Sequence, residues 1–247
     1  MFIKKIIKIK TKRKMCKSNF VHVAFIIDES GSMSGKEKDV IGGFKTVVDE
    51  QRENKNGTCS VSFYKFQTDI EKIYLGKDVN NVEYIDGQYR PHGCTALFDA
   101  VGIAIDEIGK WLNDMKEDER PEKNIIVIMT DGEENSSKEY TASKIKEMIK
   151  HQEDKYNWTF VYMGSDLKDA KDANSIGIKT RFYSTSADYN KNYDVINLAL
   201  SSYRCMTGST EEKSCYLTNT LTEQSIEVTK DYAEANGLDA ETLLKND

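Results

Sequence analysis

The chain has 247 residues, of which 38% are hydrophobic and 31% are charged, and its formal net charge at pH 7 is −6. This length suits one domain, or one domain followed by a tail, in a soluble globular protein. The negative balance argues against a general nucleic-acid binder, and no apolar run approaches the roughly 18 residues that a membrane-spanning helix needs.

The N-terminal segment differs from the rest of the chain. Residues 1–17 hold eight Lys or Arg and no acidic residue, and they lack the continuous apolar core of a signal peptide. We expect residues 1–18 to be a disordered basic arm, or in part sequence upstream of a true start at Met15. Alternatively, Ile3, Ile6 and Ile7 could share one helix face and give the arm weak contact with a membrane surface.

The cysteines are odd in number and irregular in spacing: Cys16, Cys59, Cys94, Cys205 and Cys215. Without a secretory signal, this usage is typical of reduced thiols in a cytoplasmic protein. Cys205 and Cys215 could pair, although nothing in the sequence requires it. His92 and Cys94 lie two residues apart, which is weak evidence for zinc, and we interpret them as loop residues.

The first predicted element is a strand over residues 21–27, VHVAFII, which is apolar on both alternations apart from His22. Such a strand is typical of a parallel sheet covered by helices on both faces. A helix follows, marked by apolar residues at helical spacing: Val40, Ile41, Phe44, Val47 and Val48. Residues 59–66 and 70–75 then predict two strands of a hairpin near a sheet edge.

The second half of the chain continues this alternation. Further strands are predicted at residues 124–129, 158–163 and 181–184. Helices are predicted over residues 97–112 and around residues 142–149, 167–175 and 193–203. The order predicts a doubly wound, mostly parallel, Rossmann-like α/β sheet flanked by helices, with a short antiparallel edge hairpin. We expect this domain to cover residues 19–205, and residues 206–247 to form a polar, loosely packed tail with one or two helices.

Polar side chains gather where the predicted strands end, which is where sheets of this type bind ligands. Asp28 ends the first buried strand and is followed by Ser30 and Ser32, and Asp131 follows the strand at residues 124–129. Thr95 precedes the helix at residue 97, where it would also serve as N-cap. Two carboxylates and three hydroxyls suit a hard divalent cation and leave it a position that another molecule's carboxylate could complete.

These segments resemble the motifs of von Willebrand factor A domains, the family that includes integrin inserted domains. DESGS (28–32) fits the D-x-S-x-S motif, GCTALFDAV (93–101) resembles the second motif, and MTDGEEN (129–135) resembles the third. The resemblance covers roughly residues 20–200 and implies an intact metal ion-dependent adhesion site, or MIDAS. The chain is most similar to small stand-alone cytoplasmic members from bacteria and phages.

The resemblance also implies roles for the five residues. Ser30 and Ser32 would bind Mg²⁺, or alternatively Mn²⁺ or Ca²⁺, through their hydroxyls, and Thr95 would bind it directly or through water. Asp28 and Asp131 would hold metal-bound waters. The implied partner is a protein that presents an Asp or Glu side chain to the ion, with neither nucleic acid nor a membrane span involved.

Further side chains are expected to support this site by hydrogen bonds or charge: Asp99, Thr130 and Glu133. Glu134, beside Glu133, is interpreted as a solvated loop acid. Ser165 and Asp166 follow the strand at residues 158–163 and could border the site.

Other interpretations of these motifs fit less well or stay open. Met33 occupies the position of the glycine of an EF-hand loop and of the nucleophile of a serine-hydrolase elbow. Asp28 could be a helix N-cap, and Ser30 and Ser32 ordinary turn residues. We expect a binding module and no enzyme. The alternatives are a metal-dependent hydrolase or phosphoryl-transfer enzyme, which would need a general base near the ion, and a scaffold with a vestigial site.

Overall fold

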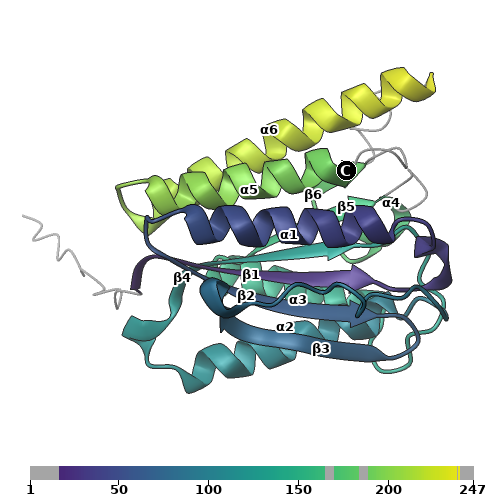
Figure 1. Ribbon diagram of the computed structural model, residues 1–247, viewed down its shortest axis with the longest axis horizontal. Helices are drawn as coiled ribbons and strands as arrows, with labels where there is room; N and C mark the ends of the chain where they lie inside the picture. The colour runs from purple at the N-terminus through teal and green to yellow at the C-terminus, as the bar shows by residue number, and fades with distance from the viewer. Residues whose placement is uncertain (1–16, 165–169, 184–188, 238, 240–247) are drawn as a thin grey trace, which may run out of the picture.

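The computed structural model describes residues 17–164, 170–183, 189–237 and 239. Their strands form a central sheet (Figure 1): β1 (Lys17–Asp28), β2 (Thr58–Phe66), β3 (Ile70–Asp78), β4 (Pro121–Met129), β5 (Thr159–Gly164) and β6 (Thr180–Tyr183). The strand order is β3-β2-β1-β4-β5-β6, and every neighbouring pair is parallel except β2 and β3. The predicted doubly wound sheet with an antiparallel edge hairpin is confirmed.

Strand β1 lies between β2 and β4, and both of its faces are buried. Val21, Val23 and Phe25 pack into one core, while Ala24 and Ile26 pack into the other. Successive side chains of a strand point to opposite faces, so a strand that is apolar at every position needs a helical layer on each side.

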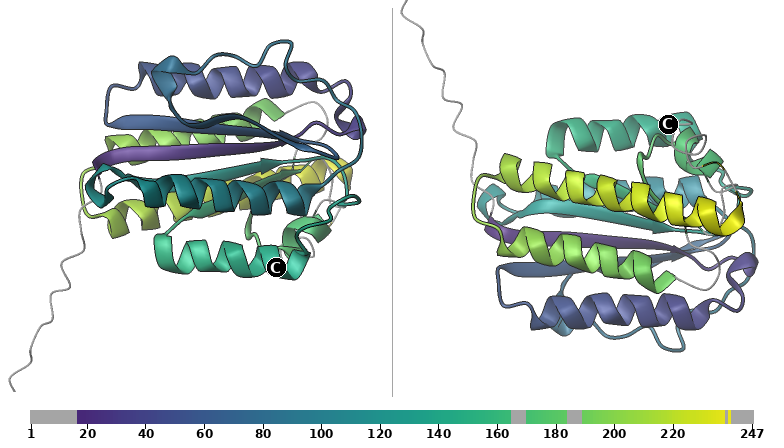
Figure 2. Two further views of the ribbon diagram at one scale, coloured as in Figure 1. Left: turned by 90° about the horizontal axis from the view of Figure 1, so that it is seen from below. Right: turned by 90° about the horizontal axis from the view of Figure 1, so that it is seen from above.

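Helices cover both faces of the sheet (Figures 1 and 2). One face carries α1 (Glu37–Glu53), α5 (Tyr189–Cys205) and α6 (Thr210–Asn236), and the other carries α2 (Leu97–Asp114), α3 (Ala142–Tyr156) and α4 (Ala170–Ser175). In the described part of the chain, three short 3-10 helices lie in loops: η1 (Gly31–Met33), η2 (Val79–Asn81) and η3 (Glu117–Glu119). The helix predicted at residues 167–175 corresponds to α4, and its first three residues lie outside the described part.

His22 is the polar exception in the apolar stretch of β1, residues 20–27, and it is fully buried. Its ring nitrogens lie 2.9 Å from the Ser60 hydroxyl and 3.2 Å from the Ser62 hydroxyl, and its ring packs beside Trp111. Burial lowers the pKa of His22 to about 3, so the imidazole is neutral in the folded protein at neutral pH.

The segment after residue 206 packs more closely than expected. Helix α6 begins with a capping box at Ser209 and buries Leu217 and Leu221 in the core that contains Phe25. It runs beside α5 (Figures 1 and 2) and also contacts β6. The expectation of loose packing was wrong because a narrow apolar stripe is enough to seat a long helix whose remaining faces are polar.

A buried ion pair also fastens the start of α6. The Lys213 ammonium donates hydrogen bonds to Glu122 at 2.7 Å and to the Asn19 side chain at 2.6 Å. The side chains of Lys213 and Glu122 are 1% and 8% exposed, respectively. Thr210 donates a further hydrogen bond to Glu122. These contacts join α6 to the start of β1 and β4.

Other expectations concern the terminus and the cysteines. Residues 1–16 of the predicted basic arm lie outside the described part, and Lys17 and Ser18 already belong to β1. Cys59, Cys94, Cys205 and Cys215 are all free thiols. Among the described helices, none combines the length and the apolar character that crossing a bilayer requires.

Candidate metal centre

Three loops meet at the carboxyl ends of the parallel strands. Residues Ile27 and Met129 are paired neighbours in β1 and β4, so the loops that follow these strands begin side by side. The loop before α2 joins them, because the Gly31 N–H donates a hydrogen bond to the Gly93 carbonyl at 3.2 Å. The topology therefore brings the three motif segments to one edge, beside the arrowhead of β1 in Figure 1.

Asp28 is the last residue of β1 and is fully buried. Its Oδ1 accepts a hydrogen bond from the Ser30 N–H at 2.7 Å, and its Oδ2 accepts one from the Thr130 hydroxyl at 2.6 Å. The contact with the Ser30 N–H is a turn interaction, as expected from the alternative interpretation of Ser30 as an ordinary turn residue. Burial raises the pKa of Asp28 to about 6, although the hydrogen bonds to its charged form oppose this shift. A cation bound nearby would oppose the effect of burial on this pKa, because it favours the ionised carboxylate.

Four of the predicted residues place side-chain oxygens close to one another near Gly132. A Cβ atom at Gly132 would lie 3.0 Å from Thr95 Oγ1, 3.1 Å from Ser32 Oγ and 3.7 Å from Asp28 Oδ2. The Ser30 and Ser32 hydroxyls are themselves 3.0 Å apart. Because glycine has no side chain, hydroxyl and carboxylate oxygens from two other loops can approach the backbone of residue 132 closely.

Asp131, the fifth predicted residue, precedes Gly132 in this loop. Its side chain is 3% exposed, and its Oδ2 forms an ion pair with the Lys36 ammonium. Its Oδ1 is buried and has no hydrogen-bond partner among the described residues. A buried carboxylate oxygen without a partner is costly, which indicates that a ligand belongs beside it. The sequence analysis did not include Lys36, because a positively charged side chain is not expected in a cation site.

Thr95 does not cap helix α2, contrary to expectation. The N-cap is Ala96, and the first N–H groups of the helix are bound by the loop after β4. Glu134 Oε2 accepts from the Phe98 N–H at 3.0 Å, and Ser137 Oγ accepts from the Asp99 N–H at 3.1 Å. The capping partners come from a distant segment, so the Thr95 hydroxyl can point toward Gly132.

Glu134 is also not a solvated loop acid. Its Oε1 accepts the N–H groups of Ser136 and Ser137 at 2.8 Å each, in addition to its contact at the start of α2. This carboxylate thereby ties the loop after Asp131 to the loop that carries Thr95. The sequence gave no indication of this, because the capped N–H group lies 36 residues away.

The expected supporting residues occupy different positions. Thr130 binds Asp28 directly, as described above. Asp99 accepts hydrogen bonds from the N–H groups of residues 138–140 at 2.7, 2.9 and 2.8 Å and so holds the end of the same loop. Glu133 is exposed, and its charge contributes to raising the pKa of Asp172 after the larger effect of burial. Ser165 and Asp166 lie outside the described residues.

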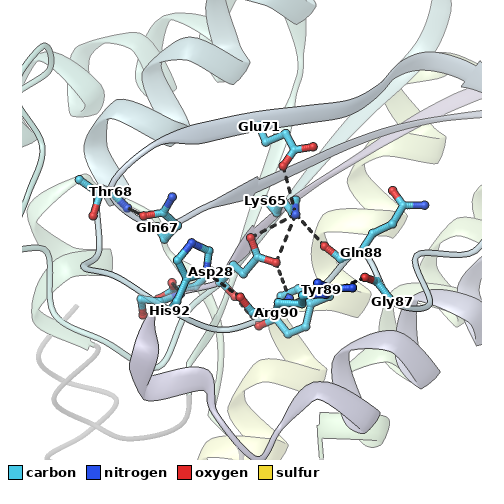
Figure 3. A network of polar contacts seen from close by, with 12 residues as sticks. Asp28, Lys65, Gln67, Thr68, Glu71, Gly87, Gln88, Tyr89, Arg90 and His92 are labelled. Carbon is cyan, nitrogen blue, oxygen red and sulfur yellow. Dashed lines mark hydrogen bonds and ion pairs between the residues drawn. The ribbon is translucent and has the colours of Figure 1, made fainter.

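A buried polar cluster fixes the rim of the site (Figure 3). The Tyr89 hydroxyl donates to the Asp28 carbonyl, and the Arg90 N–H donates to the Glu29 carboxylate, each at 2.5 Å. Lys65 lies 3.3 Å from the same carboxylate. Glu29 is 3% exposed, although the sequence placed it at a variable position of the first motif. This cluster positions the loop that leads to Thr95.

The comparisons with known proteins agree with this architecture. The model of the von Willebrand factor type A domain matches residues 22–198. The chain belongs to the von Willebrand factor type A (VWA) domain family. No curated protein matches it significantly. All five predicted metal-site residues lie within the matched part, whereas α6 follows it.

Solved structures share the fold at low sequence identity. The vWF domain of the type V pili tip protein Mfa5 from Porphyromonas gingivalis aligns with a TM-score of 0.54 and 12% identity, over 79% of this chain and 99% of that one. Proximal thread matrix protein 1 from the mussel byssus aligns with a TM-score of 0.53 and 20% identity, over 75% of this chain. This chain spans 47% of the mussel protein, which has also been solved with zinc occupying its MIDAS motif.

The donor set in this VWA domain fits a hard divalent cation. VWA domains often bind a divalent metal. Here the converging side chains offer hydroxyl and carboxylate oxygens, and no group of three or more His, Cys, Asp or Glu suited to a metal occurs within the described residues. His92 and Cys94 are exposed, and a ring nitrogen of His92 lies 2.7 Å from the Arg90 carbonyl. Oxygen ligands of this kind favour Mg²⁺, Mn²⁺ or Ca²⁺ over softer metals.

Proposed function

We propose that this VWA domain is a divalent-cation-dependent binding module that captures an acidic side chain of a partner protein. The observation that carries the proposal is the convergence of side-chain oxygens beside Gly132. Oxygens of Thr95, Ser32 and Asp28 approach this residue, and the neighbouring Asp131 has a buried Oδ1 without a hydrogen-bond partner among the described residues. Hydroxyl and carboxylate oxygens gathered in one place, with one of them unsatisfied, suit a cation site.

Each residue would have a distinct part in holding the ion. The hydroxyls of Ser30, Ser32 and Thr95 would bind it as neutral ligands. The carboxylates of Asp28 and Asp131 would supply the negative charge, directly or through bound water. When bound, the ion supplies a coordination position for a carboxylate oxygen of another molecule. Ser32 is exposed whereas Asp28 and Thr95 are buried, so the partner would approach from the side of the first loop.

The ion that we propose is Mg²⁺, with Mn²⁺ and Ca²⁺ as alternatives, and the proposed location is the cytoplasm. Mg²⁺ binds few protein ligands and keeps several waters, which suits a site with only two carboxylates. The free thiols of the described residues are compatible with a reducing compartment.

We further propose that the domain binds without catalysing a reaction. A hydrolase or phosphoryl-transfer enzyme would need a general base within reach of the ion. His92, the histidine closest in sequence to these loops, is exposed and engaged with the Arg90 carbonyl. The carboxylates of the donor set, Asp28 and Asp131, are already used by the binding role, and Glu29 is engaged with the Arg90 N–H and Lys65.

The test is capture of partner proteins from a bacterial lysate by immobilised protein, with Mg²⁺ present or replaced by a chelator. We expect captured proteins to be released by the chelator and to be absent when Ser32→Ala is immobilised. Ser34→Ala is the matched control, because Ser34 is an exposed serine of the same loop whose backbone N–H, rather than its hydroxyl, makes a contact with Gly31. Capture that persists in the chelator, or equally in Ser32→Ala and Ser34→Ala, would overturn the proposal.

A further inference from the structure

Lys36 ends the loop that carries Ser30 and Ser32, and its side chain reaches Asp131 in the loop after β4. It is the N-cap residue of α1 and follows Gly35, whose φ of 91° turns the chain toward the helix. Its ammonium pairs with Asp131 Oδ2 across the site, and its side chain is 17% exposed. The pair joins residues that are 95 positions apart in the sequence.

The position of Lys36 is not explained by the helix that it begins. Positive side chains are disfavoured at a helix N-terminus, where the helix dipole is itself positive, and preferred N-caps accept hydrogen bonds. Lys36 makes no side-chain capping bond. The helix therefore does not explain its place, whereas its ammonium does pair with Asp131 in the site.

Asp131 therefore has two oxygens in different situations. Oδ2 is paired with the lysine, and Oδ1 is buried without a partner within the described residues. The same carboxylate is one of the two that would supply charge to a divalent ion. An ammonium and a divalent ion beside one carboxylate repel each other, and this repulsion is strong where water is largely excluded.

We propose that the Lys36 ammonium is a tethered cation that competes with the divalent ion for Asp131, so that the ion binds only when the lysine moves away. This inference rests on the proposed function, since it concerns the same site. The lysine neutralises Asp131 when the ion is absent and weakens the ion's apparent affinity when it is present. Metal binding would therefore require the divalent ion to replace the Lys36 ammonium beside Asp131.

Direct Mn²⁺ titrations test this proposal, with free Mn²⁺ measured by electron paramagnetic resonance. The variant is Lys36→Met, which removes the charge and keeps the aliphatic stem. The matched control is Lys38→Met, because Lys38 is an exposed lysine on the first turn of the same helix. We expect Lys36→Met to bind Mn²⁺ about ten- to a hundredfold more tightly than the wild type, in line with loss of a partly buried ion pair. Lys38→Met should stay within about twofold, as expected for an exposed charge.

The outcomes separate this inference from the proposed function. Tighter binding by Lys36→Met alone, or binding by Lys36→Met where the wild type binds none, supports competition. Equal or weaker binding by Lys36→Met, with binding by the wild type, overturns competition and leaves the metal site standing. Absence of Mn²⁺ binding in all three proteins overturns both. Thermal unfolding in chelator checks that each variant is folded, and Asp131→Asn added to Lys36→Met should abolish the gain.

Discussion

Gly132→Ala should remove the response of the protein to divalent cations while preserving its fold. The added methyl group would lie 3.0 Å from Thr95 Oγ1 and 3.1 Å from Ser32 Oγ, so it would displace two oxygens that we assign to the ion. Gly132 is not among the glycines with positive φ, so alanine can adopt its backbone conformation. Both close neighbours are ends of side chains, which can yield by a few tenths of an ångström when no ion is present.

The magnitude follows from linkage between binding and folding. An ion present at about 100 times its dissociation constant stabilises the native state by about 2.7 kcal/mol. For a chain of this size, 1 kcal/mol corresponds to about 2–4 °C, so the wild-type midpoint should rise by roughly 5–11 °C. The methyl group itself should cost about 1 kcal/mol, at the low end for overpacking, and lower the midpoint in chelator by about 2–4 °C.

The assay is thermal unfolding followed by circular dichroism, in chelator and in Mg²⁺, Mn²⁺ or Ca²⁺. Gly42→Ala is the control, because it adds the same methyl group at a helical glycine with no atom within 4 Å of the new Cβ. We expect Gly42→Ala to keep the full metal-dependent rise and Gly132→Ala to lose it. An undiminished rise in Gly132→Ala would refute the assignment of the ion to these oxygens.

Two further predictions concern stability. The folded pKa of His22, about 3, lies below its ordinary value of 6.5, so the stability that neutral His22 provides is complete above pH 6.5 and is lost as the pH falls toward 3. Urea unfolding at pH 7 and pH 5 should therefore give a free energy of unfolding that is lower at pH 5 by about 2 kcal/mol. This loss should disappear in His22→Gln and persist in His151→Gln, the control at an exposed histidine. The same loss in both variants would contradict the assignment to His22. Lys213→Met leaves Glu122 buried without its ammonium and should cost about 3–5 kcal/mol in urea unfolding, part of which Glu122→Gln should restore. No recovery in the double variant would show that the loss comes from packing rather than charge.

Much of the fold could be predicted because its signals are local. Strands such as β1 and β4 are apolar on both faces, which indicates a sheet between two helical layers. The candidate site was likewise visible because its residues directly follow or precede these elements. Asp28 was predicted at the end of the first strand, and it is the last residue of β1. Because β1 and β4 are parallel neighbours, this position brings it beside Thr130, which follows β4.

What the sequence did not reveal depends on contacts between distant segments. Thr95 was expected to cap α2, but Glu134 binds the start of that helix from another loop. The pair between Lys36 and Asp131 joins two loops whose side-chain directions no periodicity determines. The packing of α6 was missed because only a narrow stripe, including Leu217, is apolar, and a buried ion pair completes its attachment.

The most direct test of the metal site is anomalous diffraction from crystals of the protein grown or soaked with Mn²⁺. We predict an anomalous peak beside Gly132, within ligand distance of the Ser30, Ser32 or Thr95 hydroxyls, and none there in crystals treated with chelator. A peak located only elsewhere, or no peak at a Mn²⁺ concentration far above that of the protein, would contradict the account.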